Sequence, residues 1–159
     1  MEEYKTGIRI RYEKSVDSEI KALYTEFAKW LRREYCFPLR VNVYIKSSYK
    51  IKAMDGDSVV GTFFWPGEYV KSPYIRLATG DYYELMDKYG EYQAKGELII
   101  SFAHELTHYF QYINKLDLTP IGEERQAGNY GYYILWEFED YLEANNLSIY
   151  QLTKLNFFT

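Results

Sequence analysis

The 159-residue sequence is poor in several kinds of residue, and each shortage excludes a class of protein. A single cysteine, Cys36, excludes a disulfide framework and is typical of a protein from a reducing compartment. No apolar run approaches the roughly 18 residues that cross a bilayer. The first residues also lack the basic and apolar regions of a secretory signal. We therefore expect a cytoplasmic protein that does not enter a membrane.

A surplus of basic residues is also missing. The sequence holds 19 Lys and Arg against 23 Asp and Glu, for a net charge of −4 and an isoelectric point near 5.3, which argues against nucleic-acid binding. Its 47% hydrophobic and 26% charged residues are typical of a folded globular protein. No Gly-, Pro- or Ser-rich linker divides the chain. We expect one domain, residues 1–159, with a C-terminal tail from about 147 to 159.

Four segments have the alternation, or the β-branched and aromatic composition, of strands. They are residues 8–12, 41–45, 59–65 and 74–79. Asp55-Gly56-Asp57 precedes the third and is interpreted as a turn, because a calcium loop needs ligands spread over about 12 residues. The middle of the chain is therefore expected to form a small sheet with mostly hairpin-like connections.

Three helices are predicted around this sheet. Asp17 or Ser18 caps the first, whose apolar residues recur at helical spacing until the chain leaves it at Pro38. The second, residues 97–113, is apolar nearly all round and is expected to lie buried against the sheet. The third runs from Gly122 to about Asn145. Strands that mostly precede the helices indicate an α+β fold with a mixed or antiparallel sheet of about four strands.

One motif in the second long helix carries chemistry. His104-Glu105-Leu106-Thr107-His108 has the pattern H-E-x-x-H and contains both histidines of the chain. Residues i and i+4 share a helix face, so both imidazoles reach one ion from the same side. Glu105 lies about 100° round the helix, where its carboxylate can act as a base beside that ion. The pattern predicts a zinc site with Glu105 as general base.

A catalytic zinc needs a third protein ligand, and no other histidine remains. Cys36 lies far upstream and is interpreted as structural. The third ligand is therefore expected to be a carboxylate, Glu123 or Glu124, at the start of the next helix. Glu124 is favoured because small residues share its face and allow close helix approach; these are Ala127, Gly128 and Gly131.

These residues resemble the gluzincin metallopeptidases. The likeness rests on the H-E-x-x-H motif and on Glu124-Arg125-Gln126-Ala127, an E-x-x-A that is similar to the second-helix signature of several such families. The order of predicted elements looks most like the minimal, single-domain gluzincins. The resemblance implies a zincin-like fold, with His104, His108 and Glu124 on zinc and Glu105 as the base.

The chain departs from the family pattern in two ways. Gly128 stands where related enzymes have an acid that orients a zinc histidine, and Asn129 is the nearest replacement. No histidine follows the motif to stabilise the oxyanion, so a tyrosine is expected to do so. Tyr130, Tyr132 and Tyr133 are the candidates, although packing explains each of them more readily than catalysis does.

The sequence thus predicts a zinc metalloendopeptidase, a hydrolase that cleaves a peptide or protein substrate. The strand at residues 74–79 is the expected edge to which an extended substrate adds. The aromatic tail from about residue 147 either covers the cleft or packs outside it. Two alternatives stay open: an inactive or latent zincin-like metal-binding module that captures a protein partner, and a peptidase dedicated to one regulatory protein.

Overall fold

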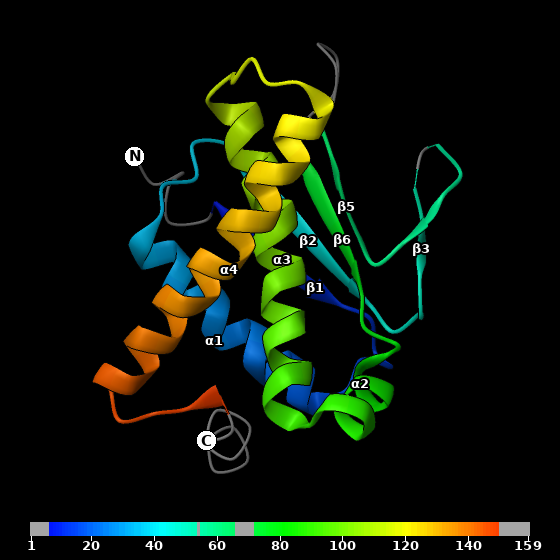
Figure 1. Cartoon of the computed structure of the whole chain (residues 1–159), viewed down its shortest axis with the longest axis vertical. Coiled ribbons are helices and arrows are strands. Elements are labelled where there is room, and N and C mark those ends of the chain that lie inside the picture. The colour runs from blue at the N-terminus through cyan, green and yellow to red at the C-terminus, as the bar shows by residue number, and fades with distance from the viewer. Residues whose placement is uncertain (1–6, 54, 66–71, 150–159) are drawn as a thin grey trace.

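The computed structural model describes residues 7–53, 55–65 and 72–149, which form an α+β fold (Figure 1). Its elements are, in order, β1 (Ile8–Tyr12), α1 (Ser18–Glu34), β2 (Val41–Lys46), β3 (Ile51–Lys52), β4 (Ser58–Val59), β5 (Gly61–Phe64), β6 (Tyr74–Ala78), α2 (Tyr82–Tyr89), α3 (Glu91–Ile113) and α4 (Pro120–Ala144). Among these residues, no helix has the length and apolar character to cross a membrane. Most of the predicted tail, residues 150–159, lies outside the described part.

The main sheet has the strand order β1-β2-β6-β5. The pairs β1–β2 and β2–β6 are parallel and only β5–β6 is antiparallel, so the expectation of mostly hairpin-like connections is wrong. The prediction that residues 74–79 form an edge strand is also wrong, because β6 lies between β2 and β5. Alternation identifies a strand but does not reveal its neighbours. The free edge next to β6 belongs to β5.

The segment predicted as one strand at residues 59–65 forms two strands instead. It changes direction at Val60, so that β4 pairs with β3 in a small antiparallel hairpin and β5 joins the main sheet. Figure 1 shows this hairpin standing away from the helices. The predicted turn is confirmed: Gly56 has a φ of 93°, and the Asp57 amide donates to Asp55 Oδ1 at 3.0 Å.

The helix boundaries follow local signals. Asp17 caps α1 by accepting from the Glu19 amide at 2.8 Å, as one of the two sequence alternatives predicted. Thr119 caps α4, and Pro120 occupies its first turn. α3 begins at Glu91, earlier than the predicted Glu97, and α2 was not predicted. Short segments rich in polar residues carry too weak an apolar pattern to identify a helix.

The core lies between the sheet and the helices. Along β2, Val41, Val43 and Ile45 are fully buried while the alternate residues are half-buried, so one face of the sheet is the covered one. Phe27 of α1 contacts Phe102 of α3 edge-on with ring centroids 5.2 Å apart. Figure 1 shows α3 between the strands and α4. The prediction that the motif helix is buried against the sheet is confirmed, because α3 contacts β5 and β6 as well as α1, α2 and α4.

Candidate metal centre

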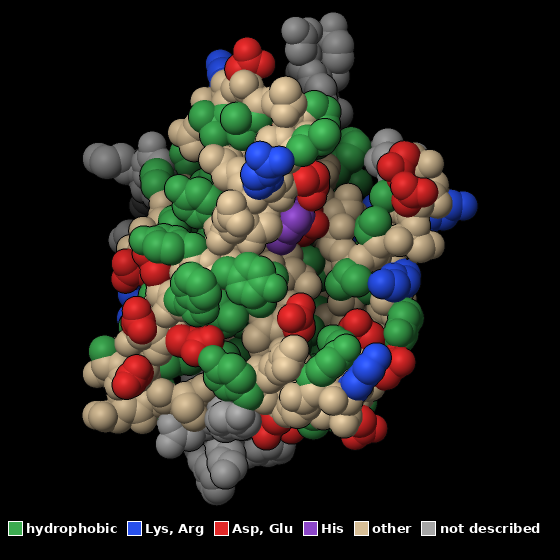
Figure 2. Space-filling model, viewed as in Figure 1, with side chains coloured by type: hydrophobic (Ala, Val, Ile, Leu, Met, Phe, Trp, Pro, Cys, Tyr) green, Lys and Arg blue, Asp and Glu red, His purple; other side chains and the backbone are tan. Residues whose placement is uncertain are grey.

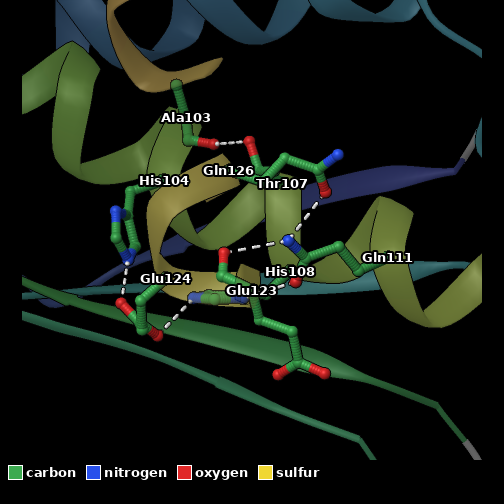
Figure 3. A network of polar contacts seen from close by, with 8 residues as sticks. All are labelled: Ala103, His104, Thr107, His108, Gln111, Glu123, Glu124 and Gln126. Atoms are coloured by element: carbon green, nitrogen blue, oxygen red, sulfur yellow. Dashed lines mark hydrogen bonds and ion pairs between the residues drawn. The ribbon is translucent and has the colours of Figure 1, made fainter. Parts of the chain in front are cut away.

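The three residues predicted as metal ligands come together where α4 crosses α3 (Figure 3). His104 and His108 stand one turn apart on α3, and Glu124 lies in the early part of α4. Glu124 Oε2 is 3.1 Å from His104 Nε2, and Glu124 Oε1 is 3.0 Å from His108 Nε2. The three ligand atoms all lie within 4.8 Å of one another. These three side chains therefore form a group of the size that holds one metal ion.

Small residues on α4 allow this close crossing, as the sequence predicted, but not all of them contribute. A Cβ at Gly131 would lie 3.4 Å from the Ile100 carbonyl oxygen and 3.8 Å from the His104 amide nitrogen. Ala127 is completely buried in the same interface. A Cβ at Gly128 would meet nothing within 4 Å, so the contact does not require that glycine.

The structure distinguishes the two acids at the start of α4. Figure 3 shows the Glu123 carboxylate pointing away from the imidazoles, whereas the Glu124 carboxylate spans both. Neither Glu123 nor Cys36 belongs to the described group of metal-binding size. Glu124 is therefore the third member of the group, as the face of small residues indicated.

The donor set fits a divalent cation. The carboxylate oxygens of Glu124 only accept, so each imidazole Nε2 that faces them either carries a hydrogen or shares a cation with them. Ligands of a tetrahedral zinc at 2.0–2.1 Å stand about 3.3 Å apart, close to the two nitrogen–oxygen separations here. Two imidazoles and one carboxylate suit zinc, and they also accept cobalt, nickel or manganese.

The surroundings favour the ligand form of His104. Burial lowers the pKa of this imidazole, the neighbouring His108 lowers it further, and Glu124 opposes both effects. An imidazole with a lowered pKa is neutral at pH 7 and offers its lone pair. The pKa shift therefore acts in the direction that metal binding requires.

Glu105, the predicted base, is 8% exposed and lies beneath the edge strand. A Cβ at Gly61 of β5 would come 3.1 Å from Glu105 Cγ and 3.2 Å from Glu105 Oε1. Burial, and then the negative charge of Glu124, raise the pKa of Glu105 to about 8. Because Gly61 has no side chain, the carboxyl of Glu105 can lie against β5 at this position. A glycine inside a strand often marks such a close approach, and this was the signal in the sequence.

The sequence prediction also missed Gln111, which contacts His108. Its Oε1 lies 2.8 Å from His108 Nδ1 (Figure 3). Asn129, the expected replacement for the missing acid, is exposed on α4. The available signal was the spacing, because Gln111 follows His108 by three positions on the same helix face.

An apolar pocket of about 540 Å³ opens beside the group. His108 and Gln111 contribute to its wall, together with side chains of β5, the end of α3 and the loop before β2. The apolar lining includes Leu39, Phe63, Trp65, Tyr112 and Leu116. A pocket of this size and composition accommodates a large apolar side chain.

The tyrosines proposed for the oxyanion lie on other faces of α4. Tyr130 and Tyr133 are about 49% and 51% exposed, and their rings contact each other at 5.9 Å. Helical geometry places them about 240° and 180° round from Glu124. Tyr132 packs on Trp136 instead, with ring centroids 6.3 Å apart. Within the described residues, no hydrogen bond or ring contact joins Tyr130, Tyr132 or Tyr133 to the two histidines or Glu124.

Comparison with protein-family models, curated proteins and solved structures finds no match for this chain. The likeness to gluzincins therefore rests on the chain's own residues, and the structure adds the convergence of His104, His108 and Glu124.

Proposed function

We propose that this protein is a metal-dependent hydrolase of peptide bonds, with zinc as its resident ion. The observation that carries the proposal is the meeting of His104, His108 and Glu124 with a buried acid, Glu105, on the same helix turn. A purely structural metal site has no need of a carboxyl group beside it.

Each of these residues has a distinct task in the proposed reaction. His104, His108 and Glu124 hold the ion, which supplies Lewis acidity when bound. Glu105 accepts a proton from the attacking water at its carboxylate oxygen. The water oxygen bonds to the carbonyl carbon, the carbon–nitrogen bond breaks, and Glu105 returns the proton to the leaving amine. A carboxyl group can carry out both proton transfers, as base toward the water and as acid toward the amine.

The substrate is proposed to bind along β5 rather than along β6. β5 is an edge of the sheet, and Glu105 lies beneath its first residue, Gly61. An extended peptide that pairs with this edge would pass over the metal group. The pocket beside His108 would then take an apolar side chain of the peptide. These placements favour a peptide over a compact small molecule.

Metal analysis of the purified protein tests the first half of the proposal. We expect about one zinc per chain, lost in His108→Ala. A peptide-hydrolysis assay with casein tests the second half: zinc-loaded Glu105→Gln should keep its metal and lose at least about 100-fold in rate. Equal rates for this variant and the wild type would show that Glu105 is not the base.

The alternative is a metal-binding module that captures a protein partner without cleaving it. The placement of Tyr130 and Tyr133 on other faces of α4 favours this alternative, because neither contacts the metal group. A wild-type protein that holds zinc but leaves both casein and a mixed peptide library intact would support the module and contradict the hydrolase.

A further inference from the structure

Gln111 is a buried amide side chain that connects the two helices of the metal group. It is 6% exposed, near the end of α3. Its Oε1 lies 2.8 Å from His108 Nδ1, and its Nε2 donates to the Glu123 carbonyl at 3.0 Å and to Gln126 Oε1 at 2.9 Å. All the polar atoms of this amide therefore have partners, on both α3 and α4 (Figure 3).

The contact with Glu123 determines which way the amide faces. A backbone carbonyl can only accept a hydrogen bond, so the atom of Gln111 that faces it must be the nitrogen. The second hydrogen of this nitrogen goes to Gln126. The oxygen of Gln111 is then the atom that faces His108, and it can only accept.

The orientation of the amide in turn favours one tautomer of His108. Because Gln111 Oε1 is an acceptor, its contact stabilises the tautomer with the hydrogen on Nδ1 over the one in which Nε2 donates to Glu124 Oε1. The lone pair of the neutral ring is then on Nε2, the atom 3.0 Å from Glu124. A metal ligand needs this form. Within the described residues, the hydrogen bond of His104 is to Glu124 through Nε2, so a contact at Nδ1 distinguishes His108.

We infer that Gln111 is a positioning residue, which holds His108 in its metal-binding tautomer and orientation. It also ties His108 to the turn of α4 that carries Glu124, through the carbonyl of Glu123. The inference rests on the proposed metal site but concerns a contact that exists before any metal binds. Gln111 thus takes the place of the acid that the sequence lacks at Gly128.

The tautomer is read from the ¹⁵N shifts of the ring nitrogens in metal-free protein, at a pH where the imidazoles are neutral. With two histidines in the chain, His104→Ala assigns the signals. We expect His108 to carry its hydrogen on Nδ1 in the wild type. Gln111→Glu keeps an acceptor and should keep this form, whereas Gln111→Leu should give a mixture of tautomers.

Zinc affinity, measured by competition with a chelator, gives the second readout. Gln111→Leu should bind zinc about 10–100-fold more weakly. Asn114→Ala, which removes a hydrogen bond to the Phe110 carbonyl in the same turn, should change it less than about 3-fold. Should Gln111→Leu fail to fold, the wild type and Gln111→Glu still decide the matter through the tautomer.

Two results would overturn the inference: a wild-type or Gln111→Glu protein with the His108 hydrogen on Nε2, or a folded Gln111→Leu protein with unchanged tautomer and zinc affinity. Failure of the proposed function has a different signature. A wild type that binds no zinc, or binds it without hydrolysis, leaves the tautomer of His108 to be measured as before.

Discussion

Ionisable side chains gather at two places along helix α3, and the two places differ in their chemistry. Near its start, Lys95 is completely buried and its ammonium group lies 2.7 Å from Glu91 Oε1, one turn away. In its second half, two imidazoles stand beside two carboxyls, those of Glu105 and Glu124. The first place contains a cation and an anion. The second contains a carboxylate, that of Glu124, which faces a nitrogen of each imidazole.

This difference separates a structural use of charge from a functional one. A buried ion pair with both partners present serves the fold. Two imidazole nitrogens and a carboxylate that converge at metal-ligand separations form the kind of group that binds a divalent cation. The end of α3 with His104 and His108 is therefore the candidate site, while the end with Lys95 is not.

The largest expected effect comes from removing Glu124, one of the three members of the metal group. Glu124→Ala takes away the oxygen that lies 3.0–3.1 Å from both imidazoles, so zinc affinity should fall by about 1000-fold or more. Glu123→Ala is the matched control, because its carboxylate points away, and should change affinity less than about 3-fold. Chelator competition measures both. Equal losses in the two variants would mean that Glu124 is not specifically a ligand.

The second effect concerns Glu105, the buried acid next to the metal group. The pKa of Glu105 rises from its ordinary value of 4.5 to about 8 on folding, so the folded metal-free protein binds more protons than the unfolded chain between these values. The contribution of Glu105 to stability therefore falls as the pH rises from about 4.5 to 8. Glu105→Gln removes this penalty and should stabilise the metal-free protein at pH 8 by about 2–4 kcal/mol.

Urea denaturation at pH 5 and pH 8 measures this difference. The stabilisation by Glu105→Gln should be larger at pH 8 than at pH 5. A variant that gains the same amount at both values would show that the carboxyl of Glu105 is not held in its neutral form by the fold.

Breaking the ion pair between Glu91 and Lys95 is expected to have a smaller effect, on stability rather than on zinc binding. Glu91→Ala removes the carboxylate next to Lys95 and should cost about 1 kcal/mol of stability, a modest amount because Glu91 is 40% exposed. Zinc affinity should not change. Thermal denaturation and chelator competition on one preparation test both statements. A loss of zinc affinity would contradict the view that the Lys95 end of α3 serves the fold and not the metal site.

The last comparison distinguishes two glycines. Gly61→Ala brings a Cβ within 3.1–3.2 Å of the Glu105 side chain, so it should displace the carboxyl and slow hydrolysis by about 10-fold with zinc affinity unchanged. Gly128→Ala meets nothing within 4 Å and should instead stabilise α4 by up to about 1 kcal/mol. Equal rates for Gly61→Ala and the wild type would show that the contact between β5 and Glu105 does not affect hydrolysis.

Local patterns predicted much of this molecule. The helical spacing of His104 and His108, and the face of small residues beside Glu124, depend only on positions within one helix, and the structure brings these three side chains within metal-binding distance of one another. The α+β class and the cap at Asp17 are confirmed for the same reason. Properties set within a single element can be read from its own residues.

Contacts between elements could not be predicted in the same way. The position of β6 inside the sheet depends on where β5 pairs, and a strand's own residues do not specify its neighbours. The contact of Gly61 with Glu105 likewise joins an edge strand to a helix. The role given to Gly128 was wrong because a helix face suggests, but does not measure, which residue is nearest to the partner helix.

X-ray absorption at the zinc edge of the loaded protein tests the central proposal most directly. The account predicts one zinc per chain with two imidazole nitrogens and carboxylate oxygen at about 2.0–2.2 Å, and one imidazole fewer in His104→Ala. A spectrum with sulfur from Cys36, or an unchanged imidazole count in that variant, would contradict it.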